Sequence, residues 1–305
     1  AGVAQPVAGA VLVKRPVLLL AAAPLAAPAH AHMAGGSFSW WLVDPLALVL
    51  LLAVAWAYWR GSVELAPRRD EQATRRLRYF WIGWGVLTLA LASPLDPLGE
   101  ELFSAHMVQH ELMMLVAAPL LVLSRPSAAL LRGSPGWLAR GVGASLRLHN
   151  LWRALASPLS AWLLHALVLW GWHLPALFSA SLESTTVHIL QHLSFLWVGL
   201  LFWWALWHAR RRGSLIGVLY LFTTAIHASA LGALLTFSPE IWYPPYLDTT
   251  ERWGLSPLAD QQLGGLIMWM PAGLVFIGAG LAEVSAYLRE SEQRVHRREQ
   301  FRGGR

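Results

Sequence analysis

Long apolar stretches, each closed by proline, glycine or charge, recur along most of this chain and constrain its fold more than any other feature. A helix of about 20 apolar residues crosses the hydrocarbon layer of a bilayer and satisfies its own backbone hydrogen bonds there. The 56% hydrophobic and 13% charged content leaves no soluble domain of useful size between these stretches. We therefore predict an all-α polytopic membrane protein with seven transmembrane helices in one bundle. The predicted spans are Leu42–Trp59, Leu77–Ala92, Leu102–Leu123, Pro158–Leu174, Thr186–Trp207, Leu215–Phe237 and Gln262–Leu288.

Arginine is distributed very unevenly over the loops between these spans. Residues 60–78, 125–153, 210–212 and 289–305 hold twenty arginines, whereas the alternate loops hold one, Arg252. Loops rich in positive charge stay on the cytoplasmic side of a membrane. We therefore expect a multi-pass protein of the plasma (inner) membrane with its N-terminus outside and its C-terminus in the cytoplasm. The net charge of +6 then reflects topology and contact with the lipid bilayer, and no nucleic-acid partner is expected.

One main domain with two flanking segments is expected. Residues 1–31 have the pattern of a signal peptide, because Lys14 and Arg15 precede an apolar run that ends in small residues. Residues 32–290 form the predicted seven-helix transmembrane domain, and residues 291–305 form a basic cytoplasmic tail. A short amphipathic helix that lies on the inner leaflet is expected within residues 125–157.

The loops and helix ends predicted to lie outside are acidic. Such a rim attracts cations, although the same carboxylates would also serve simply to keep the outer loops solvated. The acidic residues are Asp44, Asp96, Glu100, Glu101, Glu183, Glu240, Asp248, Glu251 and Asp260.

The sequence excludes several kinds of chemistry. The absence of cysteine removes thiolate metal sites, iron–sulfur clusters and covalent c-type haem. No P-loop, Gly-x-Ser-x-Gly motif or His-Glu-x-x-His motif is present. We expect a protein that is not an enzyme, in which any metal is held by histidine, methionine, carboxylate or backbone oxygen.

Histidines are concentrated in the half of the membrane predicted to be outer, where an imidazole without a polar partner costs free energy. His106 and His110 are four residues apart, so they point to nearly one face of the third span, and Met113 follows on the same face. His188 and His192 repeat this spacing on the fifth span. We expect these two pairs to face a common interior. The complete predicted ligand set is His106, His110, His173, His188, His192, His227, Met113 and Met268.

Two histidine pairs at matching depth favour a metal site. Histidine and methionine without thiolate suit copper, because imidazole binds both oxidation states and thioether favours Cu(I). The alternative for each imidazole is a hydrogen bond to a neighbouring helix. Glu111 is expected either to orient the neighbouring imidazole or to carry a proton. Four histidines lie at other depths and are expected to be structural or solvated: His149, His165, His208 and His296.

Five segments form an ordered series that is specific to one family. They are HMVQHELMMLVAAPLLVLSRP (His106–Pro126), WGWHLPALF (Trp170–Phe178), VHILQHLSFL (Val187–Leu196), IHASALGALLTFSPEIWYPPY (Ile226–Tyr246) and DQQLGGLIMWMPAG (Asp260–Gly273). Over about residues 44–287 the chain resembles the polytopic, seven-span CtaG family of cytochrome c oxidase assembly factors. The six histidines of the predicted ligand set match the family's motif histidines. The resemblance implies a role in forming active haem-copper oxidase by helping to supply copper to its catalytic subunit.

The leading hypothesis is a copper-handling assembly factor whose partners are copper ions and the catalytic subunit of a haem-copper oxidase. Two alternatives remain at this stage. A membrane redox protein would use the histidine pairs as axial ligands of haem b. A copper importer would need ligands that continue towards the inner side, where His165 and His208 are available.

Overall fold

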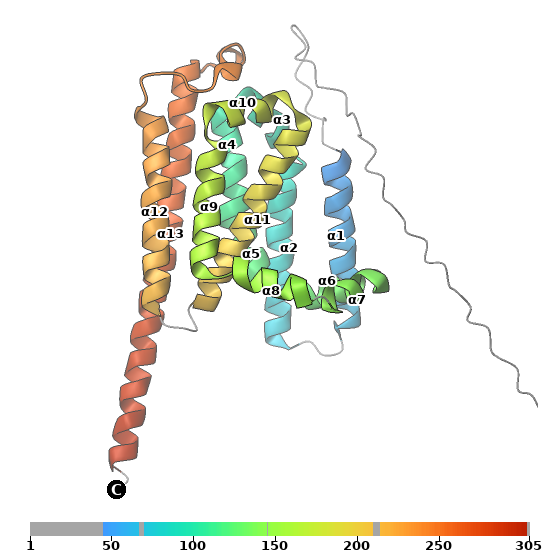
Figure 1. The fold of residues 1–305 in the computed structure, drawn as a ribbon, viewed down its shortest axis with the longest axis vertical. Coiled ribbons are helices and arrows are strands. Elements are labelled where there is room, and N and C mark those ends of the chain that lie inside the picture. The colour runs from blue at the N-terminus through green and yellow to red at the C-terminus, as the bar shows by residue number, and fades with distance from the viewer. Residues whose placement is uncertain (1–44, 67–69, 145, 210–213, 304–305) are drawn as a thin grey trace, which may run out of the picture.

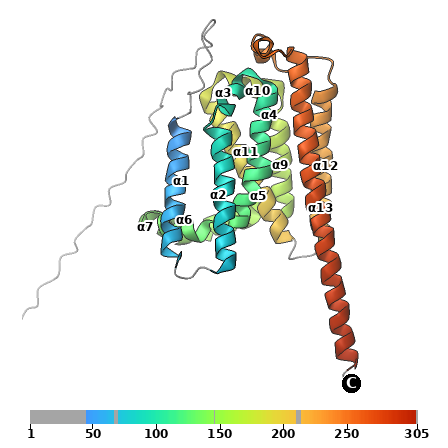
Figure 2. The same cartoon turned by 180° about the vertical axis from the view of Figure 1, so that it is seen from behind.

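A computed structural model describes residues 45–66, 70–144, 146–209 and 214–303 of the chain. The predicted signal peptide and the start of the first predicted span lie outside these residues. Within them the fold is all-α, as predicted, and no strand is found. The long helices run roughly parallel as one bundle (Figures 1 and 2). They are α1 (Pro45–Glu64), α2 (Glu71–Leu91), α4 (Phe103–Glu111) continued by η2 (Leu112–Ala117) and α5 (Ala118–Ser124), α9 (Pro158–Trp172), α11 (Thr185–Ala209), α12 (Ser214–Phe237) and α13 (Pro257–Gly303).

Shorter elements cover the two ends of this bundle. At one end, here named the capped end, lie α3 (Leu95–Glu101), α10 (Pro175–Glu183) and a loop that contains η4 (Pro244–Tyr246) and η5 (Thr250–Trp253). At the opposite end, here named the basic end, α6 (Ser127–Gly133), α7 (Gly136–Ala144) and α8 (Leu146–Leu155) run across the bundle axis (Figure 1). The sequence predicted one short helix in this region, and the structure has three. The helix α13 continues beyond the bundle at the basic end and includes most of the predicted tail.

Five of the described helical segments are long and apolar enough to cross a membrane. A sixth is added if α9 and α10, which meet at an angle of 72°, count as one broken span. The bend falls at Leu174–Pro175, where the residue before proline is held in an extended conformation. The predicted second span does form a helix, α2, but its first turns carry Arg75, Arg76 and Arg78 and are not apolar. A total of seven spans therefore stays a prediction.

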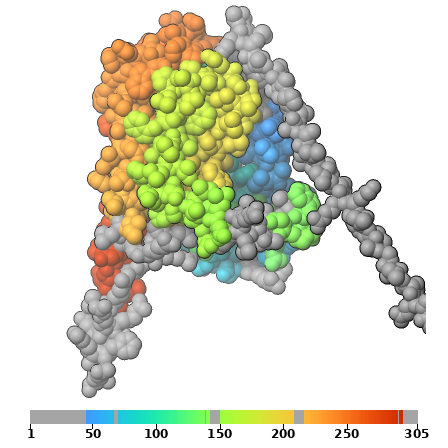
Figure 3. All heavy atoms as spheres, in the orientation of Figure 1, coloured from blue at the N-terminus to red at the C-terminus, as the bar shows by residue number. Residues whose placement is uncertain are grey.

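The outward faces of the helices are apolar. Leu159 and Leu167 on α9, Phe237 on α12 and Leu274 on α13 are each about two-thirds exposed or more. In the space-filling view, α9, α10, α11 and α12 form a continuous wall with α4 hidden behind it (Figure 3). Helices with apolar outward faces around buried polar side chains indicate a protein that faces lipid.

Close helix contacts place α13 against the helix that carries the first histidine pair. A Cβ added at Gly264 would lie 2.3 Å from the ring of Phe103, so this position on α13 must be glycine for α4 to approach. Asp260, at the start of α13, accepts hydrogen bonds from the backbone N–H groups of Phe103 (2.6 Å) and Ser104 (3.2 Å). The carboxylate therefore caps the start of α4 from a neighbouring helix.

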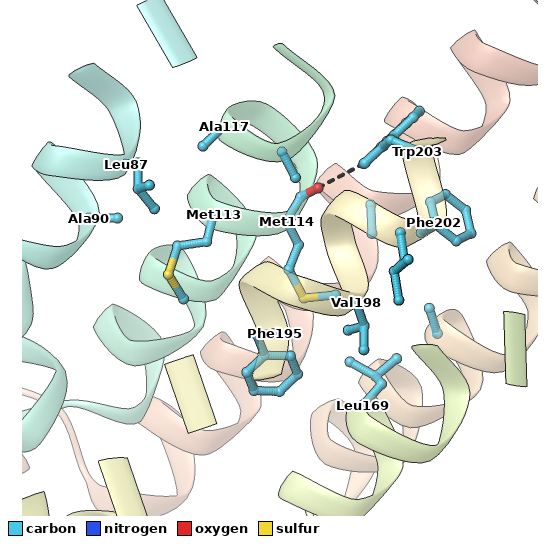
Figure 4. Close-up of a cluster of buried hydrophobic side chains, with 14 of the residues drawn as sticks. Leu87, Ala90, Met113, Met114, Ala117, Leu169, Phe195, Val198, Phe202 and Trp203 are labelled. Carbon is cyan, nitrogen blue, oxygen red and sulfur yellow. Dashed lines mark hydrogen bonds between the residues drawn. The ribbon is translucent and has the colours of Figure 1, made fainter. Parts of the chain in front are cut away.

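A wide π-helical turn, η2, interrupts the third predicted span directly after His110 and Glu111. Pro119 follows this turn, and a proline disfavours regular α-helical geometry because it has no N–H and its ring crowds the carbonyl four residues earlier. Instead, the Ala118 N–H donates to the Met113 carbonyl, five residues earlier. The Met114 carbonyl accepts a hydrogen bond of 2.8 Å from the Trp203 indole on α11 (Figure 4). Such a turn adds one residue and rotates every later side chain on the helix.

Candidate metal centre

Five histidines from three helices meet inside the bundle near its capped end. His106 and His110 come from α4, His173 directly follows α9, and His188 and His192 come from α11. Their ring centroids are 4.5 Å apart for His106–His110, 5.4 Å for His110–His192 and 5.5 Å for His106–His188. All five side chains are buried. The two pairs thus face a common interior, as expected.

Three of these imidazoles form a compact group of nitrogen ligands. One ring nitrogen from each of His106, His188 and His192 can be chosen so that all three lie within 4.8 Å of one another. The Nε2 atoms of His188 and His192 are 3.2 Å apart. Two nitrogens bound to one ion at about 2.0–2.1 Å in tetrahedral geometry are about 3.3–3.4 Å apart. The α11 pair is therefore spaced to chelate one ion, and a nitrogen of His106 lies within 4.8 Å of both.

The hydrogen bonds of His106 leave one of its nitrogens as an acceptor. Nδ1 lies 3.3 Å from the Gly99 carbonyl and Nε2 lies 3.2 Å from Gln191 Oε1. A neutral imidazole has one N–H, so it cannot donate to both oxygens. Gln191 Nε2 is buried without a partner in the described part of the chain, and rotation of the amide would let it donate to His106 Nε2. With Nδ1–H held by Gly99, Nε2 is free to accept either that amide or a metal ion.

His173 and Met107 form a second group beside the first. His173 Nδ1 donates to the Leu169 carbonyl at 2.7 Å, which leaves the lone pair of Nε2 facing the Met107 sulfur at 3.5 Å. Neither atom has a hydrogen to donate, so the two lone pairs oppose each other unless a cation lies between them. Neither nitrogen of His110 has a hydrogen-bond partner among the described residues.

A small cavity lies between His110, His173 and Met107. Its volume is about 10 Å³, roughly the space needed for one water-sized sphere. Two imidazoles, three thioethers and a carboxylate therefore surround a space suited to one ion. The lining residues are Met107, His110, Glu111, Met114, Leu169, His173, Phe195 and Met268.

Two residues of the predicted ligand set lie elsewhere. His227, on α12, packs against Trp162 and His165 of α9, with ring centroids 5.5 Å and 5.6 Å away. Depth along a helix does not fix which neighbours a side chain meets, and α12 packs mainly on α13 and α9. Met113 lies on the side of α2, near Leu87 and Ala90, whereas the thioether of Met114 lies beside Phe195 and Val198 of α11 (Figure 4).

The π-helical turn explains why Met114, and not Met113, lies near the histidines. In a regular helix Met113 would share the face of His106, but the residue added in η2 brings Met114 to that face instead. Met107, which the periodicity of α4 did not place with the histidines, lies beside His173. Of the two predicted methionines, Met268 does line the cavity.

The loop at the capped end is hydrogen-bonded directly to the site. The Tyr243 hydroxyl donates to the His173 carbonyl at 2.9 Å, and the Tyr246 hydroxyl donates to the Gly99 carbonyl at 2.7 Å. Burial raises the pKa of both phenols above their usual value, and the nearby Asp260 and Glu100 raise the pKa of Tyr246 further. Both tyrosines therefore stay protonated and keep donating. No sequence pattern indicated that the tyrosines of this loop hold the carbonyls beside two histidines.

Several acids of the predicted rim have structural partners. Asp260 caps α4, Asp96 accepts from Gln109 Nε2 at 2.6 Å, and Glu101 forms an ion pair with Arg252. The exposed acids among the described residues are Glu100, Glu183, Glu240, Asp248 and Glu251, and Asp44 lies outside the described residues. The surface available to attract cations is therefore smaller than the full set of nine carboxylates.

Comparison with known proteins identifies a family. The sequence model of the family described as cytochrome c oxidase caa3 assembly factor matches residues 56–290. Uncharacterized proteins of Mycobacterium bovis and Mycobacterium tuberculosis are each 27% identical over 281 residues, which cover 85% of this chain and 41% of theirs. An uncharacterized protein of Mycobacterium leprae is 26% identical over 272 residues, 84% of this chain and 40% of its own. The chain thus spans about two-fifths of the length of these curated relatives. No solved structure matches it.

Proposed function

Because the chain belongs to the family of cytochrome c oxidase caa3 assembly factors, we propose that it binds copper among the five clustered histidines and passes the ion to the catalytic subunit of a haem-copper oxidase. Membership of this family indicates an oxidase as the partner and a role that is not catalytic. Copper binding, copper delivery and residence in the plasma membrane are the parts that we add.

The observation that carries the proposal is the number of buried lone pairs that lack a donor. His173 Nε2 faces the thioether of Met107, and neither nitrogen of His110 has a partner among the described residues. Burying polar groups without hydrogen-bond partners costs free energy. A single cation between the rings would satisfy several acceptors at once.

The donor set favours copper over other ions. The chain has no cysteine, and carboxylates are few in the cluster, so hard cations and thiolate-bound zinc are poorly matched. The nitrogen group of His106, His188 and His192 suits either oxidation state of copper. The adjoining His173 and Met107 favour Cu(I). Because the nitrogen group and the His173/Met107 group adjoin, a copper ion could move from one to the other by exchanging one ligand at a time.

The path of the ion follows from the two ends of the bundle. The arginine distribution predicts that the capped end lies outside. Exposed acids there would raise the local concentration of cations; they are Glu100, Glu183, Glu240, Asp248 and Glu251. Tyr243 and Tyr246 close the loop over the site. Handover would take place sideways within the membrane, because the catalytic copper of an oxidase is itself buried in the bilayer.

A pair of matched histidine variants tests this proposal. His192→Ala removes a nitrogen from the proposed site, while His227→Ala removes an imidazole that lies outside it. We expect His192→Ala to lower both the copper content of the purified protein and the oxidase activity of host membranes. His227→Ala should leave both near the values of the unaltered protein. Full copper content in His192→Ala with oxidase activity still lost would indicate a scaffold that does not handle metal.

The alternative of a haem b protein receives no support from the geometry. The cavity at the cluster has a volume of about 10 Å³. A pocket for an organic cofactor such as haem has a volume of about 300–1,000 Å³. The importer alternative has one observation in its favour, because His165 and His227 form a second pair farther from the capped end. Loss of copper uptake into intact cells with His165→Ala, at unchanged oxidase activity, would favour import.

A further inference from the structure

A second and much larger cavity lies at the basic end of the bundle, between α2, α5 and α11. Its volume is about 470 Å³. Arg75 and Arg76 line it from the first turns of α2, and Arg125 lines it directly after α5. The copper site described above does not use this cavity.

Among the described residues, no carboxylate forms an ion pair with any of the three guanidinium groups. In the part of the chain that the structure describes, ion pairs join Arg60 to Glu64 and Arg252 to Glu101, and none involves the cavity arginines. The one hydrogen bond among them runs from Arg76 to the neutral amide of Gln72 at 3.4 Å. Arginine presents a planar set of donors that matches the oxygens of a phosphate group, so an anionic ligand would be bound strongly here.

The remaining walls of the cavity are apolar or amphipathic. Trp204 and Trp207 lie on the last turns of α11, and Val122 and Leu123 lie on α5. Tryptophan at the end of a membrane helix sits at the level of the lipid headgroups. Arginines on one side and apolar walls on the other fit a molecule with an anionic head and an apolar body.

We propose that this cavity binds the phosphate headgroup of an anionic phospholipid, with the start of the acyl chains against α5 and α11. Basic pockets between membrane helices on the cytoplasmic side suit such headgroups, and the arginine distribution places this end on that side. Free phosphate would bind the arginines in the same way as the headgroup, but it has no apolar part to contact Trp204 and Trp207. A lipid held here would join α2, α5 and α11 at the end away from the histidines.

Native mass spectrometry of the full chain in detergent tests the proposal, with phosphatidylglycerol or phosphatidylcholine added. We expect one phosphatidylglycerol to be retained in preference to phosphatidylcholine. Arg75→Gln/Arg125→Gln should reduce that retention at least about tenfold, the effect of losing charge-assisted hydrogen bonds. The control Arg60→Gln/Arg289→Gln removes the same charge from other surfaces and should leave retention unchanged. Equal retention of the two lipids, or equal loss in both variants, would overturn the proposal.

Two further arms complete the test. Ser127→Glu places a carboxylate at the exposed edge of the cavity without removing an arginine. It tests the same site if Arg75→Gln/Arg125→Gln does not fold. We expect it to reduce retention of phosphatidylglycerol, and unchanged retention would contradict the site. Inorganic phosphate at millimolar concentration should not displace the lipid. Displacement by phosphate alone would identify a soluble anion as the ligand and overturn the lipid assignment.

Discussion

At the scale of single residues, backbone carbonyls decide which nitrogens of the cluster can bind a metal. Leu169 holds Nδ1–H of His173, and Gly99 lies within reach of Nδ1 of His106. Both interactions leave Nε2 with its lone pair directed into the site. Ligand histidines in metal proteins are commonly held in this way through their other nitrogen. Tyr243 and Tyr246 extend this support, since each donates to a carbonyl beside one of these histidines.

The buried tyrosines predict a loss of stability at alkaline pH. Because burial raises their pKa in the folded protein, only the unfolded chain ionises as pH rises through about 10. The unfolded state then binds fewer protons than the folded state, so the free energy of unfolding is full below that pH and falls above it. We expect Tyr243→Phe/Tyr246→Phe to be less stable near pH 8, by about 1 kcal/mol for each lost hydrogen bond, but to decline less steeply above pH about 10.

Thermal unfolding in detergent between pH about 8 and 11 measures this difference. Tyr287→Phe is the control, because Tyr287 is exposed on α13, and it should follow the unaltered protein. Identical alkaline slopes for the double variant and the unaltered protein would contradict the proposed role of the two tyrosines.

At the scale of elements, the π-helical turn η2 decides which thioether meets the histidines. The widened turn, which directly precedes Ala118 and Pro119, brings Met114 rather than Met113 to the cavity. The helix therefore has two adjacent methionines in unlike surroundings. Met113 is part of the apolar core beside α2, and Met114 is at the proposed site (Figure 4).

This arrangement predicts different effects of the same substitution at neighbouring positions. Met114→Leu should lower the affinity for Cu(I) while leaving Cu(II) binding to the imidazoles nearly unchanged, because only Cu(I) favours a thioether. Met113→Leu conserves side-chain volume in the core and should change neither affinity. Titration against a competing Cu(I) chelator measures the effect. A loss of Cu(I) affinity in Met113→Leu alone would show that the helix is regular when the ion is bound.

The element scale also shows what could be predicted from the sequence. The helical class, most of the helix positions and the common interior of His106/His110 and His188/His192 follow from apolar length and the period of an α-helix. The exchange of Met113 for Met114 does not, because one added residue in a turn leaves no periodic signal. The separation of His227 depends on which helices α12 packs against, and no sequence pattern carries that information.

At the scale of the whole molecule, the bundle has two chemically distinct ends. Imidazoles and thioethers gather under the loop at the capped end, and guanidinium groups line the large cavity at the basic end. Helices α2, α4–η2–α5 and α11 connect the two regions. An assembly factor with this division would handle the ion at one membrane surface and be fixed to lipid at the other.

The central claim is that the clustered histidines bind copper, and X-ray absorption at the copper edge tests it most directly. The full chain, purified from membranes without added metal and then loaded with one equivalent of Cu(I), should show two or three imidazole nitrogens with a contribution from sulfur. His106→Ala/His192→Ala should lose the imidazole signal, and His227→Ala should keep it. Copper that is bound without imidazole scattering, or a spectrum unchanged in His106→Ala/His192→Ala, would contradict the account.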